Sequence, residues 1–436
     1  MRYFPEEGST VRGLRGTSYV LGPRIGRGGQ GAVWEDATGA WAIKIYGQAT
    51  PERQALRRRR LEQVVARRVQ SDVLIVPTEL LAAPWVGYAM PLVKGFRPVK
   101  SLIFPAPGED ALAHYHATGG PRVRYALLER LTAAFHAIHA AGLAYGDLSL
   151  DNLLVREDGR PDIRLIDCDN LVPAGSELVE VEGTPWFVAP EILRRRQAPS
   201  ERTDAHALAV LIQLTLSMRH PLLGDAVTAG PPEEEERALR GDLPWVDDPE
   251  DASNRSTVGL PASLSWTTGI GLALARAFGP GRLDATVRPT DLAWLELLGT
   301  ARDSLVTCGA APCRSEFTLR SRCPYCNERR PRVPFLVFHR TGPDGEAEQR
   351  PVVLNTPTGL RARHLVHGRS LPSEILVEAS PQPDGSVALV NRSADALVVK
   401  VERDREVLVP PGQGHLLQHK EWFQMGAHGV RGELRR

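Results

Sequence analysis

Alternating hydrophobic and polar residues predict short β-strands in the first hundred residues. The runs that fit this pattern are Ser18–Ile25, Ala32–Asp36, Ala40–Tyr46, Val73–Val76 and Trp85–Met90. Thr50 and Pro51 are typical of a helix start and predict a helix over Pro51–Gln70. Hydrophobic residues at helical spacing predict another over Arg122–Ala141, where Gly142 is a typical C-terminal stop. We therefore expect a β-rich segment followed by helices.

The pattern changes twice further along the chain. Short strands are predicted at Leu153–Val155 and Arg164–Ile166, and helices dominate between residues 203 and 298. The acidic, proline-rich stretch Pro231–Asn254 interrupts these helices, and we interpret it as a solvated loop. After residue 332 the alternation predicts a small β-sandwich, with strands near Phe335–His339, Glu374–Ala379, Val387–Asn391 and Ala396–Val401.

The composition is that of a folded protein of about two or three domains. The chain has 436 residues, of which 42% are hydrophobic and 24% charged, and its formal net charge is +1. These values exclude wholesale disorder, and the charge does not indicate a nucleic-acid or membrane partner. Apolar runs stay shorter than the roughly 18 residues of a membrane span, and Glu6 and Glu7 interrupt the N-terminus. We therefore expect a cytoplasmic protein.

A glycine-rich loop precedes a lysine in an apolar strand. The sequence Ile25-Gly-Arg-Gly-Gly-Gln-Gly-Ala-Val-Trp34 joins two predicted strands, and Lys44 lies in the strand after them. Glycines let backbone N–H groups approach phosphate oxygens, and a buried lysine can pair with the same anion. Such a lysine needs a carboxylate to hold it, and Glu62 in the predicted helix Pro51–Gln70 is the best candidate.

Three oxygen-bearing side chains follow the long helix. Asp147 and Asn152 are five positions apart, and Asp167 comes one hairpin later in Leu165-Ile-Asp-Cys-Asp169. Carboxylate and amide oxygens suit Mg²⁺, and a carboxylate can accept the proton of a hydroxyl group. Each of these residues alone is typical of a turn. Together with Lys44 and the glycine loop, they predict a phosphoryl-transfer site.

In this order the motifs resemble those of the eukaryotic-like protein kinases, over roughly residues 17–300. The segment Gly183-Thr-Pro-Trp-Phe-Val-Ala-Pro-Glu191 resembles the end of an activation segment. The resemblance implies that Asp204 ties down the loop around Asp147, and that Arg288 pairs with Glu191 to brace the helical lobe. Ser176 and Thr184 are candidate phosphorylation sites by location only.

The resemblance also implies roles for the site residues. Asp147 would accept the proton of the substrate hydroxyl, and Asn152 and Asp167 would hold Mg²⁺. Lys44, positioned by Glu62, would contact the α- and β-phosphates of ATP. The residues expected to contact the nucleotide are Ile25, Gly26, Gly28, Gly29, Gly31, Val33, Ala42, Lys44, Glu62, Met90, Asn152 and Asp167.

Three departures from the family pattern concern the catalytic loop and the metal motif. The usual His-Arg before the catalytic aspartate is Tyr145-Gly146, so we expect control by loop phosphorylation to be weak or differently built. The usual lysine two positions after that aspartate is Ser149, and the usual Phe-Gly is Cys168-Asp169. Asp169 either assists metal binding or is a turn residue, and we favour the turn. Two alternatives to an active protein kinase follow: a pseudokinase scaffold that binds nucleotide and recruits partners, and a small-molecule kinase.

Four of the five cysteines lie within 19 positions, at Cys308, Cys313, Cys323 and Cys326. Two spaced pairs of thiolates can meet at one ion and form a closed tetrahedral Zn²⁺ site. Because the pattern implies no open coordination position, we expect this zinc to be structural. Unpaired buried thiols and a [4Fe–4S] cluster are the alternatives. Cys168 stands apart and is not a ligand candidate.

The predicted fold class is α+β: a bilobal protein-kinase fold with a β-rich N-lobe and a helical C-lobe, then a small zinc module and a β-sandwich-like domain. The expected boundaries are 17–300 for the kinase domain (N-lobe about 17–93, C-lobe about 94–300), 305–330 for the zinc module and 332–436 for the sandwich. We expect a bacterial Ser/Thr protein kinase that uses ATP, Mg²⁺ and structural Zn²⁺. It also resembles a bacterial branch that accompanies a protein phosphatase and a von Willebrand A-type protein in tellurium-resistance-associated systems.

Overall fold

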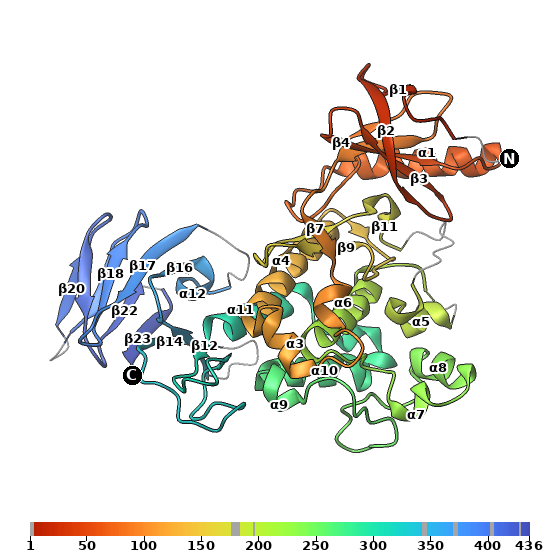
Figure 1. Ribbon diagram of the computed structural model, residues 1–436. Coiled ribbons are helices and arrows are strands. Elements are labelled where there is room, and N and C mark those ends of the chain that lie inside the picture. Colours follow the sequence, from red (N-terminus) through yellow and green to blue (C-terminus); the bar gives the residue numbers. More distant parts are fainter. Residues whose placement is uncertain are drawn as a thin grey trace. The chain divides into compact units, whose positions relative to one another are not determined.

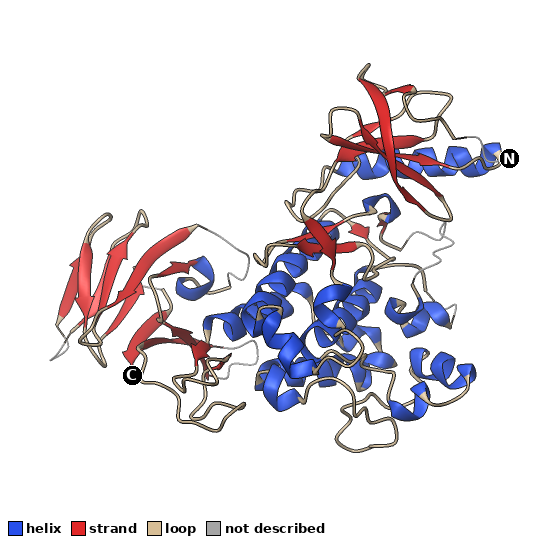
Figure 2. Cartoon of the chain, viewed as in Figure 1, coloured by secondary structure: helices blue, strands red, loops and turns tan. Residues whose placement is uncertain are grey.

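The computed structural model describes residues 4–175, 184–194, 197–341, 347–368, 374–401, 405–426 and 429–436. The chain divides into two compact units. Unit 1 comprises Met1–Gly108, Arg130–Val258 and Leu274–Arg288, and unit 2 comprises Glu109–Glu129, Gly259–Ala273 and Pro289–Arg436. Three segments that we expected in the C-lobe therefore group with the C-terminal region. Figure 1 labels the helices and strands of both units, and Figure 2 colours them by type.

Unit 1 begins with an antiparallel six-stranded sheet in the order β1-β2-β3-β4-β6-β5. Its strands are β1 (Thr10–Arg12), β2 (Ser18–Arg27), β3 (Gly31–Asp36), β4 (Trp41–Tyr46), β5 (Glu79–Leu80) and β6 (Gly87–Pro91). Alternate residues of these strands are buried and form one core, which includes Leu21, Trp34 and Ile43. The strand expected at Val73–Val76 is wrong, because only Leu74 forms an isolated β-bridge there.

One long helix accompanies this sheet. Helix α1 (Pro51–Arg67) begins where the Thr50 side chain accepts a hydrogen bond from the Arg53 N–H. It ends at Arg68, which adopts a left-handed conformation with φ 48°. Leu61 and Val64 are its buried residues, so the helix contacts the protein through one narrow face.

The rest of unit 1 is mainly helical, with short strands that carry the loops between helices. The helices are α2 (Lys100–Ile103), the C-terminal half of α4 (Gly120–Ala140), α5 (Pro190–Leu193), α6 (Glu201–Ser217), α7 (Asp225–Thr228) and α8 (Pro232–Leu239). Short strands pair in the orders β10-β9-β7 and β11-β8, with bounds Phe96–Pro98 (β7), Leu143–Ala144 (β8), Leu153–Arg156 (β9), Ile163–Leu165 (β10) and Val172–Pro173 (β11).

Two of these helices bear on the sequence predictions. Residues 203–217 of α6 are all buried, and a capping box between Ser200 and Thr203 fixes where this central helix begins. Helix α8 lies inside the stretch that we interpreted as a solvated loop, and that interpretation is wrong for this part. Ala238 and Leu239 are buried against Leu223 and Val227, which stabilises the helix despite its four consecutive glutamates.

Unit 2 contains two β-sheets that share one core. The six-stranded sheet has the order β15-β14-β23-β22-β19-β20, and the four-stranded sheet has the order β16-β17-β18-β21. The bounds are β14 (Phe335–Thr341), β15 (Ala347–Val353), β16 (Thr358–Arg361), β17 (Ile375–Pro381), β18 (Val387–Asn391), β19 (Leu397–Lys400), β20 (Glu406–Val409), β21 (Gly414–Leu417), β22 (Trp422–Met425) and β23 (Arg431–Arg435). Leu336 and Phe423 of the first sheet and Val377 and Leu389 of the second belong to one buried cluster, as in a β-sandwich.

The sandwich is joined to helices of the same unit by buried ion pairs. These helices include α3 (Ala111–Ala117), the start of α4, α9 (Ala262–Ser265), α10 (Thr268–Phe278), α11 (Asp291–Asp303) and α12 (Ala362–Leu365). Arg363 of α12 lies 2.5 Å from Glu129 of α4 and 2.7 Å from Asp303 of α11. Arg340 of β14 lies 3.0 Å from Glu296 of α11.

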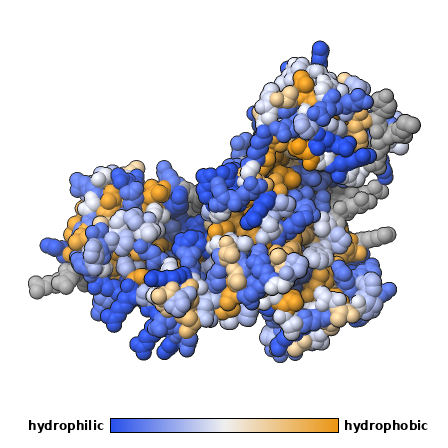
Figure 3. Space-filling view, in the orientation of Figure 1, coloured by the Kyte–Doolittle hydropathy of each residue, from blue (hydrophilic) through white to orange (hydrophobic). Residues whose placement is uncertain are grey.

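No helix of the described residues combines the length and apolar character that a membrane span requires. In the view of Figure 3, hydrophilic and hydrophobic residues are interspersed over the visible surface.

Candidate active site

Lys44 of β4 contacts two carboxylates of the segment that follows β10. Its Nζ lies 3.2 Å from Asp167 Oδ1 and 3.0 Å from each carboxylate oxygen of Asp169. The Asp169 side chain is 1% exposed, whereas that of Asp167 is 33% exposed. Asp169 is therefore the buried partner of Lys44, and Asp167 keeps a surface that a ligand can reach.

Two tyrosines complete the hydrogen bonding of Asp169. The Tyr88 hydroxyl donates to Oδ1 at 2.7 Å, and the Tyr46 hydroxyl donates to Oδ2. Both come from the sheet that carries Lys44: Tyr46 is two residues along β4, and Tyr88 of β6 is directly opposite Lys44 in the strand register. Side chains two apart, or opposite one another, share one face of a sheet. The sheet therefore presents all three donors to one carboxylate.

The charges of this cluster stabilise one another. Burial disfavours the ammonium form of Lys44, but the charges of Asp169 and Asp167 outweigh burial and raise the Lys44 pKa. Burial also acts against the ionised form of Asp169, yet Lys44 and the two tyrosine hydroxyls lower the Asp169 pKa. We conclude that Lys44 is an ammonium group and Asp169 a carboxylate, as in a fully hydrogen-bonded buried ion pair.

Glu62 does not hold Lys44 in this structure. Glu62 is exposed on α1, and among the described residues the carboxylates within reach of Lys44 Nζ are those of Asp167 and Asp169. The reason lies in helical phase: Leu61 and Val64 face the core, and successive helix residues are rotated by about 100°. The interpretation of Asp169 as a turn residue is corrected as well, because its side chain is a buried member of the cluster.

Asp147 lies in the loop between β8 and β9 and has two kinds of hydrogen-bond donor. Asn170 Nδ2 donates to Asp147 Oδ2 at 2.8 Å, and the backbone N–H of Thr184 also donates to this carboxylate. Burial raises the Asp147 pKa to about 6, the negative charges of Asp167 and Asp169 add to this, and the hydrogen bond from Thr184 opposes it. Sequence reasoning did not identify Asn170, although it lies three positions after Asp167.

Asp204 of α6 anchors the loop that carries Asp147. Its carboxylate accepts hydrogen bonds from the backbone N–H groups of Tyr145 at 2.7 Å and Gly146 at 2.9 Å, and lies 3.0 Å from His139 Nε2. The prediction that Asp204 ties down this loop is confirmed.

The ion pair expected to brace the helical lobe is also present. Arg288 Nη1 and Nη2 donate to the two carboxylate oxygens of Glu191 at 2.6 and 2.8 Å. The Arg288 side chain is completely buried, and its guanidinium also donates to the backbone carbonyls of Gly281 and Arg202. This prediction is confirmed, and the segment after Thr184 is held at its far end. Gly183 and Ser176 lie outside the described residues.

Asn152 and Asp167 lie at one end of the β9–β10 hairpin. Leu153 pairs with Leu165, and the Ile166 N–H donates to the Asn152 carbonyl at 2.9 Å, so the residues just outside the two strands are adjacent. An amide oxygen and a partly exposed carboxylate are donors that suit Mg²⁺. Ser149 orders this end of the hairpin, because its hydroxyl accepts a hydrogen bond from the Asn152 N–H at 3.2 Å.

The glycine loop and the apolar residues expected at the nucleotide lie on the same sheet. A Cβ atom at Gly28 or Gly29 would meet no atom within 4 Å, whereas at Gly31 it would lie 2.4 Å from the Ile45 carbonyl oxygen. Gly31 is thus required by strand packing, whereas at Gly28 and Gly29 the space that a side chain would fill is open. The Val33, Ala42 and Met90 side chains belong to one apolar cluster with Tyr88, while Gly26 lies on β2 beside the exposed Ile25.

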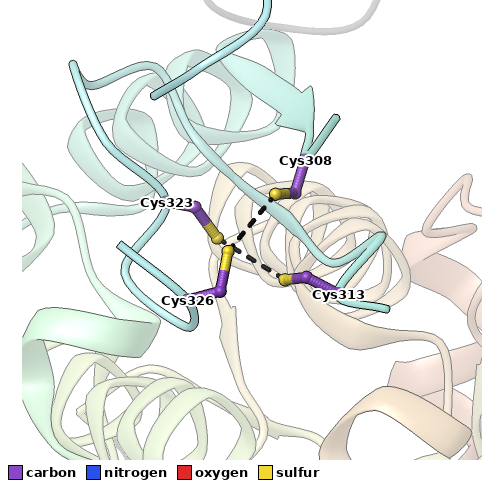
Figure 4. Close-up of side chains that lie close together, drawn as sticks. All are labelled: Cys308, Cys313, Cys323 and Cys326. Carbon is purple, nitrogen blue, oxygen red and sulfur yellow. Dashed lines mark hydrogen bonds between the residues drawn. The ribbon is translucent and has the colours of Figure 1, made fainter. Parts of the chain in front are cut away.

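Figure 4 shows that the four cysteine side chains of unit 2 point toward one another. Their sulfur atoms all lie within 4.8 Å of one another, with Cys308 Sγ 3.6 Å from Cys326 Sγ and Cys313 Sγ 3.7 Å from Cys323 Sγ. Along the chain, Cys308 and Cys313 belong to one turn, and Cys323 and Cys326 belong to another. The residue after the second cysteine of each turn has a positive φ, 48° at Arg314 and 60° at Asn327. Strands β12 (Leu305–Thr307) and β13 (Glu316–Thr318) support the first turn. Four convergent thiols fit a tetrahedral zinc ion.

Comparison with known proteins identifies the kinase relationship. A family model described as "Protein kinase domain" matches residues 19–239. Protein kinase YegI of Escherichia coli (strain K12) is 26% identical over 333 residues, which are 70% of this chain and 48% of that protein. CBL-interacting protein kinase 25 of Oryza sativa subsp. japonica is 32% identical over 103 residues, 23% of this chain and 20% of that protein. Serine/threonine-protein kinase 17A of Oryctolagus cuniculus is 34% identical over 102 residues, 23% of this chain and 25% of that protein.

The matched regions span less than half the length of each of these three relatives. The family model, by contrast, covers just over half of this chain and contains Lys44, Asp147, Asn152 and Asp167. The chain therefore belongs to the protein kinase domain family.

Proposed function

We propose that the chain transfers the γ-phosphoryl group of ATP to Ser or Thr hydroxyls of protein substrates, in a bacterial signalling or stress response. The observation that carries this proposal is the buried Lys44–Asp169 pair next to the partly exposed Asp167. It supports a site in which the Lys44 ammonium group is held in place beside the Asp167 carboxylate, which a ligand can reach. Catalysis of phosphoryl transfer depends mainly on positioning and charge stabilisation, which such an arrangement supplies.

The residues have distinct tasks in the proposed reaction. The oxygen of the substrate hydroxyl forms a bond to the γ-phosphorus, the bond from that phosphorus to the bridging oxygen of ADP breaks, and Asp147 takes the hydroxyl proton. Asn170 and the Thr184 N–H orient the Asp147 carboxylate for this task. Asn152 and Asp167 would hold Mg²⁺, which supplies positive charge beside the phosphates when bound. Lys44 contributes a fixed charge that Asp169 keeps in place.

The apolar and glycine residues of the sheet would bind the rest of the nucleotide. Val33, Ala42 and Met90 offer an apolar surface to the base, with Ile25 at its edge. The loop that contains Gly26, Gly28, Gly29 and Gly31 would lie over the phosphates, because glycines let the backbone approach them closely. Because the Asp169 carboxylate forms the buried ion pair with Lys44, we propose that Asp169, in place of Glu62, positions Lys44.

The four cysteines are proposed to bind one structural Zn²⁺, which would fold a segment too short to have a large core of its own. A cytoplasmic location, and partnership with a phosphatase and a von Willebrand A-type protein in a tellurium-resistance-associated system, stay predictions from the sequence.

Transfer of labelled phosphate from ATP tests the enzymatic proposal. The full chain is incubated with MgATP and a generic protein substrate, and wild type is compared with Asp147→Asn and Asp151→Asn. Asp151 lies in the same loop, but its side chain is 72% exposed and forms an ion pair with the exposed Lys100, so it is a matched control. We expect Asp147→Asn to lose transfer by about 10²-fold or more and Asp151→Asn to retain it.

The same assay separates the proposal from its rival. Wild type that binds nucleotide but labels neither itself nor the substrate above the Asp147→Asn background would refute catalysis. That result would favour the pseudokinase scaffold.

A further inference from the structure

A groove rich in arginine lies in unit 2, beside the second pair of cysteines. It is open to solvent and is lined by residues of the cysteine segment, the β17–β18 turn and the end of β23. We call it the arginine groove; its basic residues are Arg322, Arg329, Arg330, Arg332 and Arg436.

The guanidinium groups of this groove differ from others in the same unit. Arg340, Arg350 and Arg363 form ion pairs with carboxylates of α4, α11 or β15. In contrast, none of the five arginines of the groove forms an ion pair with a carboxylate of the described residues. Asp384, the acidic residue of the lining, is engaged by the Ser386 N–H and hydroxyl at 2.9 and 2.6 Å. The charges of Asp384 and Arg436 also interact, so the lining of the groove holds five guanidinium groups against one carboxylate.

Several of these arginines are held in place rather than free to spread apart. Arg322 and Arg329 face each other in an antiparallel β-bridge on either side of the Cys323–Cys326 turn. Arg322 Nη1 donates to the Asn327 carbonyl at 2.8 Å, and the Arg330 guanidinium lies over the Phe335 ring at 5.4 Å. Arg436 Nε donates to the Gly385 carbonyl at 3.2 Å. Fixing like charges together is unfavourable unless an anion neutralises them, so this geometry is that of an anion site.

We propose that the arginine groove binds a phosphorylated Ser or Thr segment of a protein. Arginine guanidinium groups match phosphate oxygens with paired, charge-assisted hydrogen bonds. Clusters of arginines are a recurrent mode of phosphopeptide recognition. The groove also has an apolar wall of Val333, Pro334 and Pro383, which suits the side chains that flank a phosphorylated residue. The choice of a phosphorylated protein as the ligand rests on the proposed kinase activity, because the products of that activity would carry phosphate groups.

Nucleic acid fits the groove less well. Binding of single-stranded nucleic acid relies on aromatic side chains that stack with bases, and the lining contains none. Asp384 adds a negative charge to the wall, where a continuous phosphate backbone would meet it. The net charge of the whole chain is only +1, which does not itself indicate a nucleic-acid partner.

Fluorescence anisotropy with the full chain tests this proposal in the absence of ATP. The probes are degenerate 11-residue peptides with a central phosphothreonine or phosphoserine, and the same peptides without phosphate. We expect phosphorylated peptides to bind at least about tenfold more tightly, because one charge-assisted contact is worth that factor. The test variant is Arg329→Gln with Arg332→Gln, since both residues are exposed and the structure shows no side-chain hydrogen bond for either among described residues.

The double variant should lose about tenfold or more in affinity for phosphopeptide, and Arg329→Lys with Arg332→Lys should recover only part of it, because lysine lacks the fork of donors. The matched control is Arg392→Gln, an exposed arginine of the sandwich that pairs with Glu378, and it should bind as wild type does. Retained zinc content and an unchanged unfolding midpoint show that each variant is folded.

Three results would overturn the proposal: equal affinity with and without phosphate, unchanged affinity in the double variant, or tighter binding of a single-stranded 20-nucleotide RNA that the double variant abolishes. Because Asp147→Asn should bind phosphopeptide as wild type does, failure of binding and failure of catalysis are distinguishable.

Discussion

Replacing Asp169 by Asn removes the charge that holds Lys44 while keeping the shape of the side chain. In the wild type the two carboxylate oxygens accept hydrogen bonds from Lys44 Nζ, Tyr46 and Tyr88. An amide has one oxygen and a donating NH₂ group, so it cannot accept from all three donors. Part of the cluster would then be buried without a partner.

The magnitude follows from burial. Breaking a buried ion pair by removing one partner costs about 3–5 kcal/mol, and the Lys44 and Asp169 side chains are only 10% and 1% exposed. We therefore expect the free energy of unfolding to fall by about this amount. Lys44 keeps only Asp167, the expected magnesium ligand, so phosphate transfer should fall by about 10²-fold, the effect of losing one preorganised charge.

Urea unfolding and transfer of labelled phosphate measure the two effects, and two variants isolate the cause. Glu62→Gln alters the residue that sequence reasoning favoured; because this side chain is exposed, transfer should stay within about twofold of wild type. Tyr88→Phe removes one hydrogen bond to the Asp169 carboxylate and keeps the ion pair, so it should cost less, about 1.5–3 kcal/mol. Loss of transfer in Glu62→Gln, with a stable and active Asp169→Asn, would refute the assignment of Asp169.

Three further predictions concern other parts of the molecule. Glu191→Gln leaves the completely buried Arg288 guanidinium without its carboxylate, so unfolding in urea should become easier by about 3–5 kcal/mol; an unchanged midpoint would contradict this. Asp204→Asn should weaken the anchoring of the catalytic loop, and transfer should fall while hydrogen exchange at the Gly146 N–H speeds up; exchange at the wild-type rate would argue against the anchor. Metal analysis should find about one Zn²⁺ per chain in the wild type and in Cys168→Ala but none in Cys323→Ser, and equal zinc in all three would rule out the proposed site.

The chemistry-bearing residues could be predicted where local sequence carries the information. The cysteine pairs needed only their spacing, and Asp204 and Arg288 needed only their place in an ordered set of motifs. The β-sandwich followed from period-two alternation, which reports burial on one face of a sheet. In each case a short stretch of sequence was enough for the prediction, without knowledge of distant contacts.

Asp169 and α8 show why the remainder could not be predicted. Asp169 is 125 positions from Lys44, and its burial depends on two tyrosine hydroxyls whose convergence exists only once β4 and β6 pair. Glu62 was favoured for its place in a helix, but it faces outward because the neighbouring Leu61 and Val64 are the residues that the core buries. The run of glutamates in α8 is polar enough for a loop, and its helix depends on the burial of Ala238 and Leu239. Tertiary contacts override local pattern in all three cases.

The ion pairs of Arg363 bear on how such a chain could have been assembled or re-engineered. Glu129 comes from the segment that we expected to belong to the kinase, and Asp303 ends helix α11, which begins in that segment; their shared partner is contributed by the region after residue 332. Recombination that exchanged this region for an unrelated one would have to replace all of these charges at once. A shortened protein that ended near residue 303 would remove Arg363 and leave Arg302 to pair with both carboxylates. Its inactivity would not by itself be evidence that the removed part regulates the kinase.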